Sequence, residues 1–151
     1  AGAQGFIAPD LPAEEAGPML EAWGAHGPCL VPMVAPTSTE ARIAQACAVA
    51  QGFVYCVSVA GVTGTRSALP ATLGTFVDRV RAQTSLPLAV GFGVSERAHV
   101  EAIGALADAA VVGSALVDVI AREADSSDLV TTVERYVAGL KRGAQGGASV
   151  T

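Results

Sequence analysis

Two apolar runs in the second half of the chain each end at a glycine and lead into a pattern typical of a helix. Residues 86–90 run into Gly91-Phe92-Gly93, and residues 109–112 run into Gly113-Ser114. Such strand ends place backbone N–H groups, and here one hydroxyl, at helix N-termini, where the helix dipole favours negative charge. A lone Gly-Phe-Gly would indicate only a turn, but two such ends in series predict a phosphate cradle.

Four further residues with useful chemistry belong to the earlier part of the chain. Asp10 could act as a base or orient a polar group, although the residues alone favour a turn or capping role between two prolines. Tyr55 lies in the third apolar run, and Thr63 and Gly64 lie in the glycine-rich loop beyond it. That loop could close over an anion, or it could be no more than a surface connection.

Short apolar runs alternate with longer amphipathic stretches along the chain. The runs predict strands at residues 6–8, 29–35, 53–59, 86–90 and 109–112. The stretches predict helices at residues 14–26, 40–50, 73–83, 95–106 and 128–140, with a short helix after Ser114. Thr37 and Glu40 have capping-box spacing, and Ser95 is the expected N-cap of its helix.

This alternation of strands and helices predicts an α/β protein with a parallel sheet and right-handed crossovers. An open sheet and a barrel both fit the pattern, and in both the reactive surface lies at the carboxyl ends of the strands. We expect residues 1–142 to form one domain and residues 143–151 to be a disordered tail.

Composition argues against several classes of function. A net charge of -5 over 151 residues is unlike a nucleic-acid-binding surface. No apolar run reaches the roughly 20 residues of a membrane span, and the N-terminus lacks a signal-peptide pattern. The cysteines form no CxxC pair, so we expect reduced, buried thiols in a cytoplasmic protein without a metal site. Both histidines, His26 and His99, are expected to face solvent.

The order and spacing of several motifs resemble the tryptophan synthase alpha subunit. They are Pro9-Asp10-Leu11-Pro12, Val34-Ala35-Pro36-Thr37-Ser38, Gly52-Phe53-Val54-Tyr55 with Val57-Ser58, Gly61-Val62-Thr63-Gly64, Val90-Gly91-Phe92-Gly93-Val94 and Val112-Gly113-Ser114-Ala115. The resemblance runs through residues 2–142, and Gly-Val-Thr-Gly after Phe-Val-Tyr is its most specific part. This motif argues against another phosphosugar-binding barrel.

The resemblance implies a (β/α)8 TIM barrel and a lyase of tryptophan biosynthesis. In that family the alpha subunit cleaves indole-3-glycerol phosphate to indole and glyceraldehyde 3-phosphate, and it has no cofactor of its own. The indole passes to a beta subunit that holds pyridoxal phosphate, within a cytoplasmic heterotetramer.

The same resemblance implies roles for individual residues. The phosphate-binding positions of the family correspond in this resemblance to Gly64, Gly93, Gly113 and Ser114. Tyr55 and Phe92 resemble residues that line the substrate pocket, and Thr63 resembles the threonine on the mobile loop. Asp10 resembles a strand-end aspartate near the alpha–beta contact.

The chain resembles only the fourth to eighth units of the family's barrel. The family's acid/base glutamate on the second strand, and the aspartate on the following loop, have no counterpart here, so we predict no catalytic residue. Asp108 is no substitute, because it precedes its strand and so lies at the wrong end. A positioned acid/base commonly contributes about 10²–10⁴-fold, so we expect phosphate binding with poor turnover.

Several explanations of the shortness stay open. The chain could be a piece of a full-length subunit, one of two copies that pair edge to edge, or a natural short protein stabilised by a partner. Five strands would leave unpaired edges and exposed apolar faces, which favour self-association. A non-catalytic phosphate-binding or scaffold module derived from the barrel is the alternative to a lyase.

Overall fold

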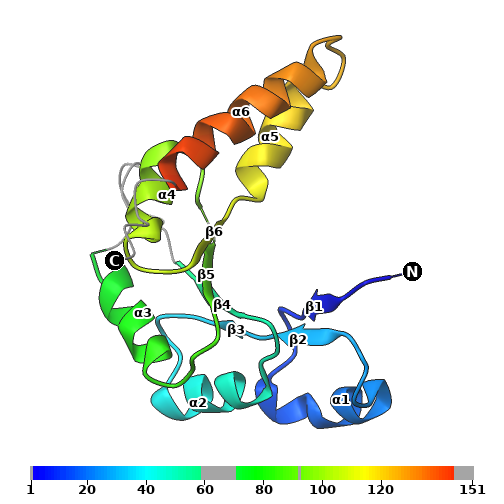
Figure 1. The fold of residues 1–151 in the computed structure, drawn as a ribbon, viewed down its shortest axis with the longest axis vertical. Coiled ribbons are helices and arrows are strands. Elements are labelled where there is room, and N and C mark those ends of the chain that lie inside the picture. Colours follow the sequence, from blue (N-terminus) through cyan, green and yellow to red (C-terminus); the bar gives the residue numbers. More distant parts are fainter. Residues whose placement is uncertain (1, 59–70, 92, 145–151) are drawn as a thin grey trace.

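The computed structural model of the protein describes residues 2–58, 71–91 and 93–144. Its strands form a curved row in which every pairing is parallel (Figure 1). A two-stranded sheet joins β1 (Gly5–Ile7) to β2 (Cys29–Val31). The four-stranded sheet has the order β3 (Met33–Val34), β4 (Val54–Val57), β5 (Leu88–Gly91) and β6 (Ala109–Val111).

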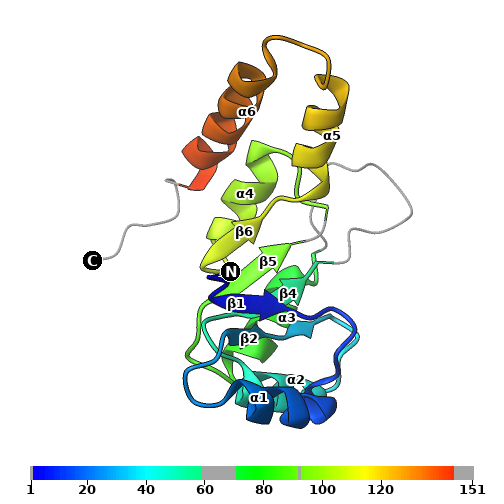
Figure 2. The same cartoon turned by 90° about the vertical axis from the view of Figure 1, so that its right-hand side faces the viewer.

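Helices connect the strands, as the alternating pattern predicts. They are η1 (Ala13–Glu15, a 3-10 turn), α1 (Gly17–Trp23), α2 (Glu40–Val49), α3 (Leu73–Arg81), α4 (Arg97–Gly104), α5 (Ser114–Arg122) and α6 (Leu129–Ala144). Helices α2, α3 and α4 lie along one side of the row of strands, and α5 and α6 form an antiparallel pair beyond β6 (Figure 1). Figure 2, turned by 90° about the vertical axis, shows the same arrangement with the strands toward the viewer. The α/β barrel architecture is therefore present, in partial form.

The run predicted as one strand over residues 29–35 divides into β2 and β3 at Pro32. Proline has no N–H to donate, but the Pro32 carbonyl accepts a hydrogen bond from the Tyr55 N–H at 3.0 Å. Before the proline the segment pairs with β1, and after it the segment pairs with β4. A strand that passes from one neighbour to the next in this way gives the stagger that a curved, barrel-like sheet requires.

The main hydrophobic core lies between the four-stranded sheet and helices α2, α3 and α4. In β4, Val54 and Cys56 are buried while Tyr55 and Val57 are half-buried. This alternation turns Val54 and Cys56 toward the helices and Tyr55 toward the opposite face. With few aromatic residues in the chain, Phe76 is the one aromatic side chain in this core among the described residues.

Helix boundaries differ from the sequence-based predictions in three places. The N-cap of α2 is Thr39, not Thr37, and its Oγ1 accepts a hydrogen bond from the Arg42 N–H at 3.3 Å. The N-cap of α4 is Glu96, not Ser95. The helix predicted over residues 14–26 is shorter, because Pro18 lies in the first turn of α1 and so separates it from η1.

The C-terminal helix is longer than the pattern predicts. Helix α6 runs to Ala144, two residues into the segment predicted to be a tail. Residues 145–151 lie outside the described residues. In the part of the chain that the structure describes, no helix is long and apolar enough to cross a membrane.

The two ends of the row of strands are open within the described residues. β1 pairs only with β2, and β6 pairs only with β5. Phe6 and Ile7 of β1 are 47% and 46% exposed, and the Phe6 ring stacks on Trp23 with 5.5 Å between ring centroids. The described strands therefore do not close a barrel, as expected from their number.

Candidate functional site

A pocket of about 250 Å³ opens at the carboxyl ends of β4, β5 and β6. It is lined by Tyr55, Gly93, Val94, Val111, Gly113 and Ser114. Four residues selected from the sequence, Tyr55, Gly93, Gly113 and Ser114, thus meet around one cavity. Val94 and Val111 form its apolar walls, and sequence reasoning did not single them out.

Tyr55 extends from β4 across the open face of the sheet toward the end of β5. A Cβ atom on Gly91 would overlap the Tyr55 hydroxyl and lie 2.6 Å from its Cζ. Only glycine at position 91 therefore leaves room for the tyrosine ring, a role that sequence reasoning missed. Burial raises the pKa of the Tyr55 hydroxyl, so the group keeps its proton at neutral pH and can donate a hydrogen bond into the pocket.

The strand end at β5 is fixed by its neighbour. The Gly91 carbonyl accepts hydrogen bonds from the Ser58 N–H at 2.8 Å and from the Ser58 hydroxyl at 3.0 Å. Gly93 follows with a φ of 78°, in the left-handed region that favours glycine. Its backbone turns beside the pocket without a side chain to cover it.

Strand β6 leads through Gly113 into the N-terminus of α5. Gly113 is the N-cap, and no side chain of the described residues caps the helix there. The φ of Gly113 is -116°, and a Cβ atom there would meet no atom of the described residues within 4 Å. Packing of the described residues therefore does not require glycine at this position. Open space over a helix N-terminus suits a bound anion.

The remaining predicted site residues are not brought to this pocket. Asp10 is exposed and lines a separate cavity of about 240 Å³ with Met33 and Arg42. Thr63, Gly64 and Phe92 lie outside the described residues.

The prediction that His99 faces solvent is wrong, whereas His26 is exposed as expected. His99 is 4% exposed, because it lies four residues before Ile103 and shares the apolar face of α4. Its Nδ1 accepts a hydrogen bond from the Ser95 N–H at 3.3 Å, and its Nε2 lies 3.4 Å from Glu96 Oε1. The apolar residue four positions ahead was the signal that could have revealed this burial.

Asp108 lies at the opposite end of the strands, as predicted. Its Oδ2 accepts hydrogen bonds from the Leu88 N–H at 2.8 Å and from Arg81 at 2.5 Å. The Leu88 N–H, followed by Arg81, holds the pKa of the Asp108 carboxyl below its usual range. This carboxylate therefore joins the start of β5 to α3 and has no access to the pocket.

The cysteines have the properties of structural thiols. Cys47 and Cys56 are buried, Cys29 is half-buried, and all three are free. Burial raises the pKa of Cys56 to about 12, with a smaller increase from Cys47 and an opposing effect of Arg81. A thiol that stays protonated at neutral pH is a poor nucleophile.

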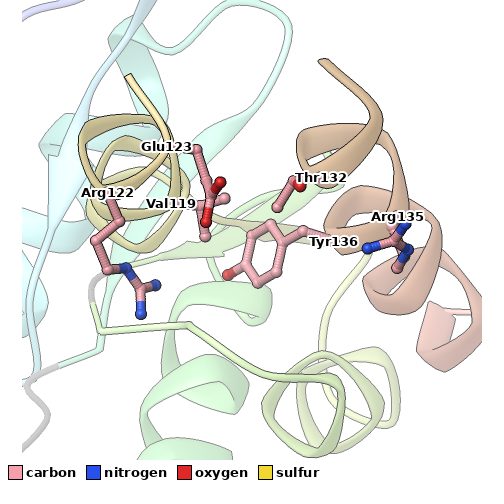
Figure 3. A pocket seen from close by; sticks show the side chains of 6 residues that line it. All are labelled: Val119, Arg122, Glu123, Thr132, Arg135 and Tyr136. Carbon is pink, nitrogen blue, oxygen red and sulfur yellow. The ribbon is translucent and has the colours of Figure 1, made fainter. Parts of the chain in front are cut away.

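A third pocket, of about 330 Å³, lies between α5 and α6. It is lined by Val119, Arg122, Glu123, Thr132, Arg135 and Tyr136 (Figure 3). Figure 3 shows the two arginine side chains on opposite sides of Tyr136. The Tyr136 hydroxyl donates a hydrogen bond to the Ser95 carbonyl at 2.7 Å. No cluster of metal-ligating side chains occurs among the residues that the structure describes.

Parallel strands, helices on their outer side and a pocket at the carboxyl ends of the strands define this chain as part of a (β/α) barrel. A family model described as "Tryptophan synthase alpha chain" matches residues 1–145. The chain belongs to the tryptophan synthase alpha chain family.

Curated relatives and solved structures agree with this assignment. The tryptophan synthase alpha chain of Roseiflexus sp. (strain RS-1) is 48% identical over 141 residues, which are 93% of this chain and 54% of that protein. Tryptophan synthase from M. tuberculosis superposes with a TM-score of 0.79 at 33% identity, covering 95% of this chain and 51% of that one. The alpha chain from Legionella pneumophila gives a TM-score of 0.82 at 27% identity, covering 99% and 55%. The chain spans about half the length of the relatives that it matches.

Proposed function

We propose that this chain acts in tryptophan biosynthesis as part of a tryptophan synthase alpha chain, a lyase that cleaves indole-3-glycerol phosphate to indole and glyceraldehyde 3-phosphate. One observation carries the proposal: Tyr55, Gly93, Gly113 and Ser114 meet around one pocket, in a chain of this family. The pocket is the proposed site of the substrate's phosphate.

Each part of the pocket has a proposed task. The N-terminus of α5 and the Ser114 hydroxyl bind phosphate oxygens, and the bare backbone at Gly93 allows their close approach. The Tyr55 ring, with Phe92, lines the space for the rest of the substrate. In the same proposal Gly64 adds to the phosphate site and Thr63 belongs to a loop that closes over it.

Chemistry beyond binding needs groups that the described pocket lining does not contain. Retro-aldol cleavage must protonate a ring carbon of the indole and remove a hydroxyl proton, which calls for a positioned acid and base. The polar side chains that line the pocket are two hydroxyls, those of Tyr55 and Ser114. We infer that the acid/base carboxylates belong to the other half of the barrel, and that these 151 residues alone turn over poorly.

A beta subunit that holds pyridoxal phosphate is the proposed partner, with Asp10 near the contact. The exposed position of Asp10, away from the phosphate pocket, is compatible with that role. Self-association through the open edges at β1 and β6 is the alternative association. A cytoplasmic location stays a prediction from composition.

Phosphate binding and indole release test this proposal separately. Crystals soaked in phosphate should show an anion beside Gly93 and Ser114, and the 151-residue chain should release no indole above the uncatalysed rate. An empty pocket at saturating phosphate would contradict the binding role. Indole release by the 151 residues alone would contradict the assignment of the acid/base groups to the other half.

A non-catalytic phosphate-binding module is the second candidate. It is favoured by the pocket lining, where the described residues contribute neither a carboxylate nor an imidazole. Assay of the protein as its gene encodes it distinguishes the two, because a lyase forms indole from indole-3-glycerol phosphate and a binding module does not.

A further inference from the structure

Side chains from two helices hold both backbone polar groups of Ser95. The Ser95 N–H donates to His99 Nδ1 at 3.3 Å, and the Ser95 carbonyl accepts from the Tyr136 hydroxyl at 2.7 Å. Ser95 directly follows Val94, and both Val94 and Gly93 line the anion pocket. The two side chains therefore fix the peptide that continues from the pocket wall.

The hydrogen bond to His99 defines which nitrogen of its ring carries the proton. Because Nδ1 accepts a hydrogen bond, it carries no proton, and the proton of the neutral ring sits on Nε2, which lies 3.4 Å from Glu96 Oε1. The ring is 4% exposed and Val94 is 2% exposed. A buried ring that accepts a hydrogen bond from the Ser95 N–H has little freedom to leave Ser95.

Tyr136 connects the two walls of the pocket through α6. This helix packs against α4, which follows Gly93, and against α5, which begins at Ser114. The tyrosine side chain lies between α5 and α6 (Figure 3) and reaches Ser95, 41 residues earlier in the chain. Burial raises the pKa of the Tyr136 hydroxyl, so it keeps the proton that it donates.

A second pair of hydrogen bonds fixes the backbone before Gly93. Ser58 holds the Gly91 carbonyl with two hydrogen bonds, so Gly93 lies between two fixed peptides. Glycine is the residue with the greatest backbone freedom, and a loop that must be ordered by its ligand binds that ligand more weakly. The hydrogen bonds at Gly91 and Ser95 lower this cost for Gly93 before an anion arrives.

We propose that His99 and Tyr136 are positioning residues for the anion pocket, which hold the Ser95 peptide so that Gly93 and Val94 stay in place to receive a phosphate group. The inference rests on the proposed phosphate-binding role of this pocket. It adds two residues outside the pocket, one of them on the last helix, to the set that determines phosphate affinity.

Affinity for inorganic phosphate tests the proposal, measured by calorimetric titration of the protein as its gene encodes it. Tyr136→Phe removes only the hydroxyl, and His99→Leu replaces the imidazole, with its acceptor nitrogen, by an apolar side chain. Each should raise the dissociation constant about three- to tenfold, the worth of one hydrogen bond. His99→Asn should restore affinity, because its Oδ1 is attached to Cγ, as Nδ1 is, and can accept from the Ser95 N–H.

Val100→Ala is the matched control, because Val100 is buried on the same helix next to His99 but forms no hydrogen bond with Ser95. It should lower the melting temperature and leave phosphate affinity unchanged. Equal loss of affinity in the control, or no rescue by His99→Asn, would show a general packing effect and overturn the proposal. If His99→Leu does not fold, Tyr136→Phe alone tests the positioning role. A phosphate affinity of this variant equal to that of the unaltered protein would overturn that role.

Failure of the proposed function gives a different result. If the unaltered protein binds no phosphate, the pocket assignment is wrong and the positioning role falls with it. If the unaltered protein binds phosphate and both single variants bind it equally well, only the positioning role is overturned.

Discussion

Strands β5 and β1 are similar in sequence type but differ in surroundings. All four residues of β5 are buried, with β4 and β6 on its sides and helices against one face. All three residues of β1 are exposed, although they include Phe6 and Ile7. Stability in this chain is therefore concentrated in the β3–β6 sheet and its helices, whereas β1 buries little apolar surface.

The largest expected contrast is between two phenylalanines. Phe76→Ala should lower the free energy of unfolding by about 3–5 kcal/mol, because Phe76 is 2% exposed in the main core. Phe6→Ala, at an exposed position on β1, should cost less than about 1 kcal/mol. Urea unfolding followed by circular dichroism measures both. Equal losses would show that the β1 end contributes as much stability as the core.

Two strand glycines give the next contrast. Gly91→Ala should destabilise by about 1–3 kcal/mol and displace Tyr55, because the new methyl group overlaps the tyrosine ring. At Gly5 a Cβ atom would lie 3.1 Å from the Cys29 carbonyl oxygen, a tight contact that the outer strand can relieve by a small shift. Gly5→Ala should therefore have little effect. Melting temperatures measure stability, and tyrosine fluorescence reports the displacement.

Two arginines extend the comparison to ion pairs. Arg79 donates to Glu40 Oε1 at 2.5 Å, to the Pro36 carbonyl at 3.2 Å and to the Ser38 carbonyl at 2.7 Å, which ties α3 to the start of α2. Arg79→Gln should cost about 1–2 kcal/mol. Arg42 lies 3.9 Å from Glu14 in an exposed pair, so Arg42→Gln should cost less than about 0.5 kcal/mol. Chemical denaturation of both variants measures the loss of unfolding free energy in each. A larger loss for Arg42→Gln than for Arg79→Gln would contradict this prediction.

The last comparison concerns a pH dependence from Asp108. Its pKa is lower in the folded state, so its contribution is present above the usual value near 3.8 and is lost as pH falls through the folded pKa. Because the side chain is 47% exposed, the contribution should be under about 1 kcal/mol. Asp108→Asn should be less stable than the unaltered chain at pH 7, and the gap should narrow below pH 4. Arg81→Gln, the reciprocal variant, should show the same narrowing in thermal melts, and a gap independent of pH would contradict the assignment.

Much of the fold could be predicted because its signals are local. Apolar runs followed by glycine predicted the ends of β5 and β6, which stop two residues before Gly93 and Gly113, and helical spacing predicted α2 and α3 to within a few residues. The motifs also led to the correct family. The grouping of Tyr55, Gly93, Gly113 and Ser114 followed because parallel strands present their carboxyl ends on one side.

Other features could not be predicted because they depend on distant partners. His99 was assigned to solvent because a histidine is polar, but the face of α4 on which it lies packs into the core. The division at Pro32 depends on which strand lies on each side, and the need for glycine at position 91 depends on a tyrosine of the neighbouring strand.

The order of strands and helices, the glycines after β5 and β6 and the family follow from the amino-acid sequence, because periodicity and turn residues are properties of neighbouring residues. The pairs of residues that meet are set by the packed fold: Tyr55 over Gly91, Ser58 on the Gly91 carbonyl, and Tyr136 on Ser95. Those contacts join segments more than thirty residues apart. Hydrogen bonds and packing form only when the chain has brought these surfaces together, and no local pattern encodes them.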